Sequence, residues 1–217
     1  DGIRPGMLGG AAAVSFYATK NLTCGEGGAL ATRHDDLAER VRILRLHGLD
    51  RDAARRYERF RHFDMVALGY KYNMNDIQAA MLIPQLDRVE DMHAARLDLL
   101  RDYTSRLAES EVPVRMPVVM PGVDHACHLM VIRVDAGRRD RLIAHLQAHD
   151  IGVAVNYRPV HLTSYYREAL GITSGSCPHA ELMGEEVVSL PFYRGLTSGE
   201  LDYILHGIES FYSGETK

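Results

Sequence analysis

Cysteine, long apolar runs and surplus positive charge are all scarce in this sequence. The cysteines Cys24, Cys127 and Cys177 are odd in number and far apart, which argues against a disulfide framework. They indicate a reducing compartment, so we expect a cytoplasmic protein. No apolar run reaches the roughly 18–20 residues that a membrane span needs. The formal net charge of −4 leaves no basic surplus for phosphate backbones, which argues against nucleic-acid binding.

The remaining composition is that of an ordinary globular protein, with 46% hydrophobic and 25% charged residues. At 217 residues the chain could form one large domain or two small ones. The first residues, DGIRPG, lack the cationic and apolar segments of a signal peptide. Because no initiator methionine precedes them, we expect a processed chain or a piece of a longer one.

A hairpin is predicted near the N-terminus. The apolar run Ala11–Tyr17 indicates a buried strand, and Gly28–Thr32 indicates a second strand. Gly25, Gly27 and Gly28 lie between them and suit a turn with positive φ angles. The two strands should therefore pair across this turn.

Helical spacing follows the hairpin. A helix is predicted over Leu37–Leu46, capped by Asp35 or Asp36 and ended by Gly48. The charged segment Leu49–Val66 indicates a surface loop.

A longer helical pattern begins after Asn75, its predicted cap, and continues to Leu107. It contains Pro84, which favours a kink. Such a helix often links two domains.

The proline-rich segment Val112–Gly122 marks the predicted boundary between residues 1–111 and 112–217. After it, strand and helix patterns alternate. Strands are predicted at His128–Val134, Ile151–Tyr157 and Val187–Leu190, and helices at Arg138–His149, Ser164–Leu170, Pro178–Gly184 and Ser198–Tyr212, the last capped by Thr197. Helices on one face of a small sheet would give an α+β domain.

Lys20 lies between the first predicted strand and the glycine-rich turn. A lysine becomes a nucleophile when removal from water favours its neutral form, and it then forms Schiff bases with carbonyls. The hydroxyls of Ser15 and Thr19 could hold a phosphate. Most lysines near strand ends are nevertheless solvated, so residue type alone leaves both interpretations open.

The window SFYATKNLTCGEGG, Ser15–Gly28, resembles the lysine signature of the DegT/DnrJ/StrS-type sugar aminotransferases, a branch of the fold-type I pyridoxal-phosphate enzymes. That signature is approximately S-F-(aromatic)-x-T-K-N-(aliphatic)-x-x-G-E-G-G. Further segments resemble family motifs in the same order: LRLHG (Leu44–Gly48), LGYKYNMNDIQAA (Leu68–Ala80), HACHLMVIRV (His125–Val134), GVAVNYRPVH (Gly152–His161), the P-x-A-E residues Pro178, Ala180 and Glu181, and SLPFY (Ser189–Tyr193). The resemblance covers nearly the whole chain.

This resemblance implies an α/β fold, the C-terminal part of a fold-type I PLP-dependent transferase. Residues 1–111 would be the remainder of the large cofactor-binding domain, and residues 112–217 a small α+β domain. Lys20 would hold pyridoxal 5′-phosphate through a Schiff base, and Ser15 would bind its phosphate. The acidic partner of the pyridine nitrogen lies upstream of the signature in the family, so the chain alone should bind the cofactor weakly or not at all.

The resemblance also implies a homodimer with shared active sites, because the residue at the position of Lys71 reaches the phosphate in the neighbouring subunit. Tyr157 and His161 would border the sugar-nucleotide pocket, and His47 would lie near its mouth. The implied reaction moves an amino group from an amino acid, usually L-glutamate, to a nucleotide-linked keto-sugar, with Lys20 as base and acid. Cys127 and Met130 replace aromatic residues that are frequent in the family.

Two other functions are weighed. A non-catalytic remnant, or a fragment that depends on a partner, would keep the fold and motifs without the activity. Dehydration is disfavoured, since the family's dehydratases carry histidine in place of the catalytic lysine.

No metal site is predicted. His145 and His149 have the spacing of a metal pair on a helix, but no third ligand is evident, so a solvated face is expected. His125, Cys127 and His128 are expected to be structural. Cys24 should be a small buried hydrophobe, and Tyr165–Tyr166 could face substrate or pack. The remaining methionines of interest are expected to fill the core: Met65, Met74, Met81 and Met92.

Overall fold

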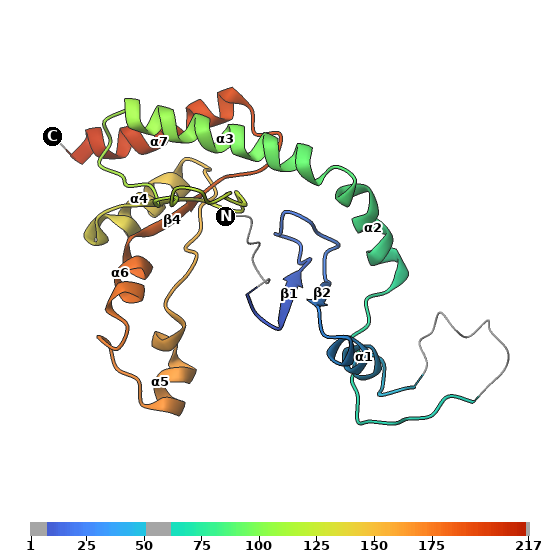
Figure 1. The fold of residues 1–217 in the computed structure, drawn as a ribbon. Helices are drawn as coiled ribbons and strands as arrows, with labels where there is room; N and C mark the ends of the chain where they lie inside the picture. Colours follow the sequence, from blue (N-terminus) through green and yellow to red (C-terminus); the bar gives the residue numbers. More distant parts are fainter. Residues whose placement is uncertain (1–7, 51–61, 216–217) are drawn as a thin grey trace. The chain divides into compact units, whose positions relative to one another are not determined.

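The structure is a computed structural model that describes residues 8–50 and 62–215 of the chain (Figure 1). The chain divides into two compact units, Asp1–Val89 and Glu90–Lys217. Most of the predicted surface loop Leu49–Val66 lies outside the described residues. Among the described residues, no helix combines the length and the apolar character needed to cross a membrane.

The first unit contains the predicted hairpin. Strands β1 (Ala11–Ser15) and β2 (Gly28–Thr32) pair antiparallel. The expected burial of the first strand, Ala11–Tyr17, is wrong, since Val14 is 45% exposed and Tyr17 is 46% exposed. The physical reason is that a ribbon of two strands leaves much of its surface in water.

Helix α1 (Asp35–Leu44) follows the hairpin. Its N-cap is His34 and not the predicted Asp35 or Asp36, which lie in the first turn, where negative charge favours the helix dipole. The hydroxyl of Thr32 accepts a hydrogen bond from the His34 N–H at 3.1 Å. Gly48 has φ +71° and donates to the Ile43 carbonyl, so it follows the end of the helix as predicted.

The predicted long helix is divided into α2 (Asp76–Leu86) and α3 (Val89–Glu109). Asn75 caps α2 as predicted, and its Oδ1 accepts from the Gln78 N–H at 2.9 Å. Pro84 has no N–H to donate to the preceding turn, and α2 ends two residues after it.

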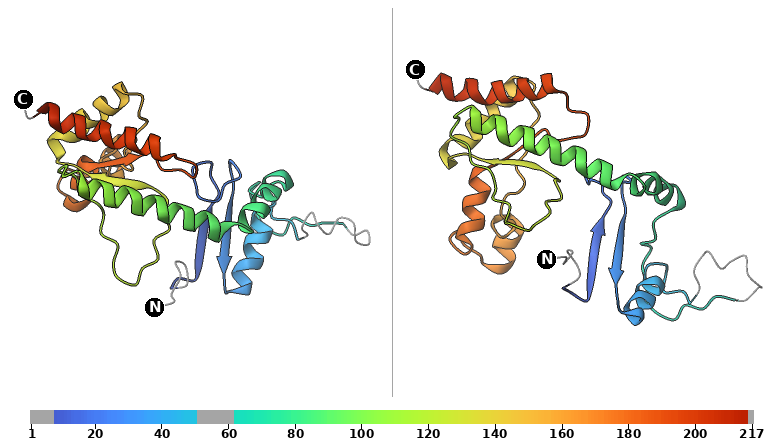
Figure 2. Two further views of the ribbon diagram at one scale, coloured as in Figure 1. Left: turned by 90° about the horizontal axis from the view of Figure 1, so that it is seen from above. Right: turned by 45° about the horizontal axis from the view of Figure 1, so that its top comes forward.

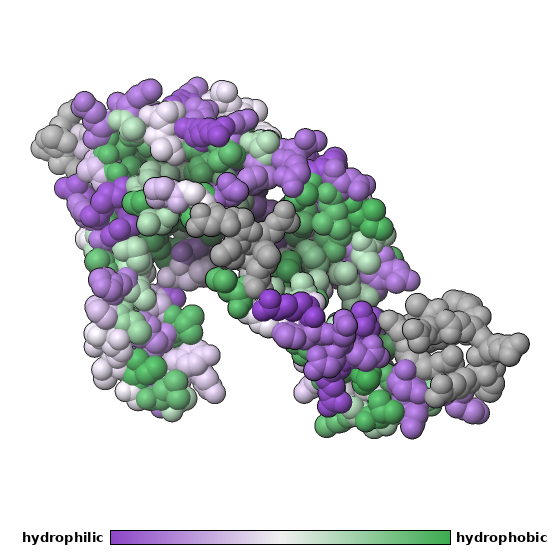
Figure 3. All heavy atoms as spheres, viewed as in Figure 1, coloured by the Kyte–Doolittle hydropathy of each residue, from purple (hydrophilic) through white to green (hydrophobic). Residues whose placement is uncertain are grey.

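Helix α2 exposes apolar side chains, and Figure 3 shows the hydrophobic surface over it. Ile77 is 78% exposed, Ile83 61% and Leu86 53%. The prediction that Met65 and Met81 fill the core is wrong for the described residues, since they are 63% and 50% exposed. A helix that is apolar on several faces is typical of one that is covered by further protein.

The second unit is built around strands β3 (Met130–Arg133) and β4 (Val187–Leu190), which pair antiparallel. Figure 2 shows α3 running beside the last helix, α7 (Ser198–Glu215). The remaining helices are α4 (Ala136–Ala148), the 3₁₀ turn η2 (Val160–Leu162), α5 (Ser164–Leu170) and α6 (Pro178–Glu186). The core of this unit includes Tyr103, Leu107, Met130, Ile132, Val134, Leu142, Leu146, Val188, Leu201 and Ile208.

The division between the two units falls at Val89 and Glu90, because α3 buries Tyr103 and Leu107 in the core of the second unit. The division into residues 1–111 and 112–217 concerns the domains of the complete protein and stays a prediction.

The predicted strand Ile151–Tyr157 is wrong. The segment forms a single bridge, in which Ala154 and Ser189 exchange hydrogen bonds of 3.1 and 2.7 Å. The chain turns at Asn156 and Tyr157 before a longer ladder can form.

The cap of α7 is confirmed. The Thr197 hydroxyl accepts from the Glu200 N–H at 3.2 Å, and the Glu200 carboxylate accepts from the Thr197 N–H at 2.7 Å. This reciprocal pair is a capping box, and it satisfies two N–H groups at the start of the helix.

Candidate functional site

Lys20 lies in the tight turn that follows β1. Its N–H donates to the Tyr17 carbonyl at 2.9 Å, and the residue is half-buried. The hydroxyl of Ser15, the last residue of β1, accepts from the Tyr17 N–H at 3.3 Å, so Ser15 and Lys20 both bond to Tyr17. Within residues 8–50 and 62–215, no hydrogen bond or ion pair engages the Lys20 ammonium. A primary amine and a hydroxyl are therefore both available to a ligand.

The rest of this turn is fastened to α2 through Gln85. The Gln85 side-chain amide donates to the Thr23 carbonyl at 2.7 Å and accepts from the Thr23 N–H at 3.0 Å. The Thr23 hydroxyl donates to the Phe16 carbonyl and accepts from the Gly25 N–H. Cys24 beside it is buried, as predicted, and is 3% exposed. Segments that are distant in the sequence thus fix the lysine turn.

The glycines of the turn serve two different needs. Gly25 has φ +82°, so positive φ is confirmed there. Gly27 and Gly28 do not have positive φ, and that part of the prediction is wrong. They provide space instead: a Cβ at Gly27 would stand 2.5 Å from the Cys24 Sγ, and a Cβ at Gly28 would stand 2.9 Å from the Val14 carbonyl oxygen.

Replacing Gln85 with alanine should loosen the lysine turn without unfolding the second unit. The loss of two hydrogen bonds is expected to lower the free energy of local opening by about 1–2 kcal/mol. Hydrogen exchange at the Thr23 and Cys24 amides of the full-length gene product measures this. Gln78→Ala on the same helix is the matched control and should leave both amides unchanged. Equal exchange in the two variants would contradict the fastening role.

His47 and Lys71 are brought together by pairing of the LRLHG and LGYKY segments. The His47 N–H donates to the Tyr70 carbonyl at 2.8 Å, and Leu46 and Lys71 form a β-bridge. Both side chains are exposed, and the Lys71 ammonium donates to the Asn73 Oδ1. The structure therefore places these two predicted residues on neighbouring backbone segments.

Tyr157 and His161 lie on one loop of the second unit. Tyr157 is 68% exposed, whereas the His161 side chain is 16% exposed and its Nε2 lies 3.0 Å from the Glu181 Oε1. Tyr165 and Tyr166 follow on α5 and contact each other edge to face, and Tyr165 is 73% exposed.

Glu181, the last residue of the P-x-A-E motif, contacts the candidate site residue His161, a contact that the sequence does not predict. Its carboxylate accepts hydrogen bonds from His161, from the Ser174 hydroxyl and from the Gly175 and Cys177 N–H groups. The hydrogen bond from His161 first, then those from Gly175, Ser174 and Cys177, lower the pKa of Glu181 to about 2.

The Glu181 carboxylate should become protonated only at strongly acidic pH. The folded pKa lies below the ordinary value of 4.5, so the stabilisation is complete above that value and is lost as the pH falls towards about 2. We expect the Glu181 carboxyl-carbon NMR signal to stay at its ionised position down to about pH 3. The variant His161→Gln removes the hydrogen bond that lowers the pKa of Glu181 most, so the titration midpoint of Glu181 should rise. A midpoint that is the same in both proteins would contradict this assignment.

The predicted site residues fall into two sets. Ser15, Lys20, His47 and Lys71 belong to the first unit, and Tyr157 and His161 belong to the second.

Metal-ligand geometry is absent among the described residues, where no three His, Cys, Asp or Glu side chains converge. His145 contacts the Phe211 ring and bonds the Ser210 hydroxyl, so it is partly buried and not on the solvated face that was predicted.

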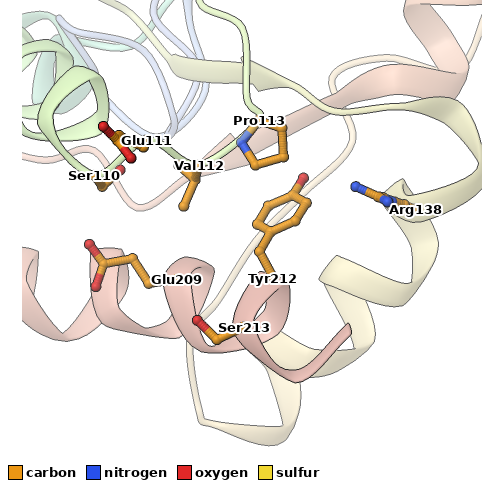
Figure 4. Close-up of a pocket in the computed structure, with 8 residues that line it drawn as sticks. All are labelled: Ser110, Glu111, Val112, Pro113, Arg138, Glu209, Tyr212 and Ser213. Carbon is orange, nitrogen blue, oxygen red and sulfur yellow. The ribbon is translucent and has the colours of Figure 1, made fainter. Parts of the chain in front are cut away.

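A cavity of about 630 Å³ lies elsewhere in the second unit (Figure 4). It is lined by Ser110, Glu111, Val112, Pro113, Arg138, Glu209, Tyr212 and Ser213. The Arg138 guanidinium lies 5.7 Å from the centre of the Tyr212 ring. No predicted site residue lines this cavity.

Comparison with known proteins gives a consistent match. The sequence profile of the DegT/DnrJ/EryC1/StrS aminotransferase family matches residues 1–209. An uncharacterised protein of Methanocaldococcus jannaschii is 36% identical over 218 residues, which cover 98% of this chain and 56% of that protein. The spore coat polysaccharide biosynthesis protein SpsC of Bacillus subtilis is 35% identical over 217 residues, covering 96% and 55%.

Solved structures match over the same extent. Spr1654 of Streptococcus pneumoniae, described as a candidate sugar aminotransferase, matches in its PMP-form with a TM-score of 0.88 at 28% identity. The match covers 98% of this chain and 55% of that one. Its PLP-form gives a TM-score of 0.86 at 27% identity. The chain thus spans about half the length of the curated relatives it matches.

Proposed function

The chain belongs to the DegT/DnrJ/EryC1/StrS aminotransferase family, and from this premise we propose that its protein is a PLP-dependent sugar aminotransferase. It transfers an amino group from an amino acid, L-glutamate, to a nucleotide-linked keto-sugar. The observation that carries this proposal is the lysine turn: Lys20 is half-buried, its ammonium has no hydrogen-bond or ion-pair partner among the described residues, and its turn is fastened by Gln85.

Ser15 and Lys20 fit pyridoxal 5′-phosphate chemically. The amine of Lys20 would bond the carbonyl carbon of the cofactor with release of water, and the Ser15 hydroxyl would donate to its phosphate. When bound, the cofactor supplies an electron sink for the carbon that gains or loses the amino group. Once the amino group of the substrate has replaced it on the cofactor, Lys20 Nζ would carry a proton between the substrate carbon and the cofactor, which is the work of a positioned base and acid. Gly27 and Gly28 keep the turn free of side chains that would displace it.

The proposed enzyme is a homodimer with shared active sites. Lys71 reaches the phosphate bound in the neighbouring subunit, and the exposed apolar face of α2 supports burial against further protein. His47, paired through its backbone with Tyr70 beside Lys71, lies near the mouth of the pocket. Tyr157 and His161 border the sugar nucleotide, with His161 held by Glu181.

Reductive trapping tests the proposal. The full-length gene product, loaded with pyridoxal phosphate and treated with borohydride, should gain the cofactor's mass on the peptide that carries Lys20. It should also aminate a keto-sugar linked to dTDP, UDP or GDP, with L-glutamate as donor. Label on another lysine would overturn the assignment of Lys20. A folded protein that neither takes the label nor transfers amino groups would instead favour the non-catalytic remnant.

A further inference from the structure

The carboxylate of Glu181 is surrounded by hydrogen-bond donors. The Ser174 hydroxyl donates at 2.7 Å, the Gly175 N–H at 2.8 and 2.9 Å to the two oxygens, the Cys177 N–H at 3.1 Å and the His161 Nε2 at 3.0 Å. Three of these donors lie on the turn before α6, and the fourth lies on η2. The Glu181 carboxylate therefore joins the loop that carries Tyr157 and His161 to the turn that precedes α6.

Helix α6 holds this loop at a second point, one helical turn further on. Gly184 lies three residues after Glu181, on the same side of the helix, and a Cβ at Gly184 would overlap the ring of Pro159. The helix is itself fixed to its neighbours, because the Arg139 guanidinium donates to the Gly184 carbonyl at 2.8 Å. The buried Glu186 carboxylate accepts from the Arg133 Nε at 2.9 Å.

The contact with Glu181 leaves one ring nitrogen of His161 available. A carboxylate can only accept, so Nε2 carries the proton in this hydrogen bond. Nδ1 has no hydrogen-bond partner among residues 8–50 and 62–215. In the neutral ring Nδ1 is then an acceptor, which suits an O–H group of a ligand.

We propose that Glu181 is a positioning residue, which fixes His161 in its Nε2-protonated tautomer so that Nδ1 accepts a hydrogen bond from a hydroxyl of the nucleotide-linked sugar. The proposal rests on the proposed function, because it takes His161 as a residue of the sugar pocket. Glu181 acts through the histidine and does not itself touch the substrate.

The first test needs no substrate. The full-length gene product is labelled with ¹⁵N in its histidine rings, and NMR spectra correlate the ring nitrogens with the ring protons at neutral pH. The signals of His161 are assigned as those missing from the His161→Gln variant. They should show the Nε2-protonated tautomer. Glu181→Gln should convert His161 to a mixture of tautomers. A glutamine amide has one acceptor oxygen and one donor NH₂ group, so it can bond either the protonated or the unprotonated Nε2. Glu185→Gln removes one exposed charge from the same helix and should leave the tautomer unchanged. An unaltered tautomer in Glu181→Gln would overturn the proposal.

The second test uses activity. Glu181→Gln should raise KM for the keto-sugar substrate about tenfold while kcat changes less than about twofold, because a hydrogen bond to a ligand is weakened before the chemical step. In a His161→Gln background the same change should have no further effect on KM. If KM is higher in the double variant than in His161→Gln alone, Glu181 does not act through His161 and has only a structural role. If the wild type transfers no amino group, the proposed function fails, and the tautomer measurement still decides on Glu181.

Discussion

Arginine in place of Lys20 is expected to lower kcat of the full-length gene product for transamination by about 10³-fold or more. The guanidinium keeps the positive charge, but it cannot lose a proton near neutral pH or form a Schiff base with a carbonyl. Steady-state kinetics with L-glutamate measure the loss, and borohydride treatment should no longer label the turn that carries residue 20.

The matched control is Arg40→Gln, which removes a cation from an exposed position of α1. It should leave kcat within about twofold of the wild type, as surface changes away from a site usually do. If Lys20→Arg keeps a tenth or more of the wild-type kcat, Lys20 does not carry the reaction, and the turn around it has another role.

Gly48→Ala is expected to have the largest effect on the stability of the first unit. Gly48 has φ +71°, and an added Cβ would overlap the carbonyl oxygen of Ala67. A Cβ at Gly69 would likewise overlap the backbone of Gly48. The clash involves backbone atoms and not the end of a flexible side chain, so we expect a loss of about 3 kcal/mol or more in the free energy of unfolding.

Urea unfolding of the full-length gene product, followed by hydrogen exchange at the His47 amide, measures this loss. The His47 N–H donates to the Tyr70 carbonyl, so its protection reports on the segments that bring His47 and Lys71 together. Gly137→Ala in α4 is the control: nothing lies within 4 Å of the added Cβ, and alanine should stabilise the helix by up to about 1 kcal/mol. Equal stability of the two variants would contradict the close approach at Gly48.

The fold class predicted from the resemblance is confirmed. The chain matches the family profile, and it superposes on about half the length of the solved structure of Spr1654. The helix predicted over Ser164–Leu170 and the strands at Gly28–Thr32 and Val187–Leu190 are also confirmed. The predicted strand at Ile151–Tyr157 is wrong because the chain turns at Asn156 and Tyr157, so the segment pairs with β4 at Ala154 alone.

The assignments of Lys20, Ser15, Lys71, His47, Tyr157 and His161 stay predictions that the experiments above address. Their backbone surroundings, however, could not be read from residue order. Gln85 fastens a turn more than sixty residues away, and nothing near Gln85 in the sequence signals that contact.

The amino-acid sequence by itself determined the features whose cause lies within a few neighbouring residues. Asn75 and Thr197 begin helices because a side-chain oxygen reaches an N–H in the next turn. The signature around Lys20 likewise identifies the family within one short window.

Only the tertiary structure decided the features that need two distant segments. It assigned α3 to the second unit through the burial of Tyr103, and it joined Glu181 to His161 across a loop and a helix. The physical reason is that a cap or a turn is fixed by local geometry, whereas a hydrogen bond between remote side chains exists only after the core has packed and set their distance.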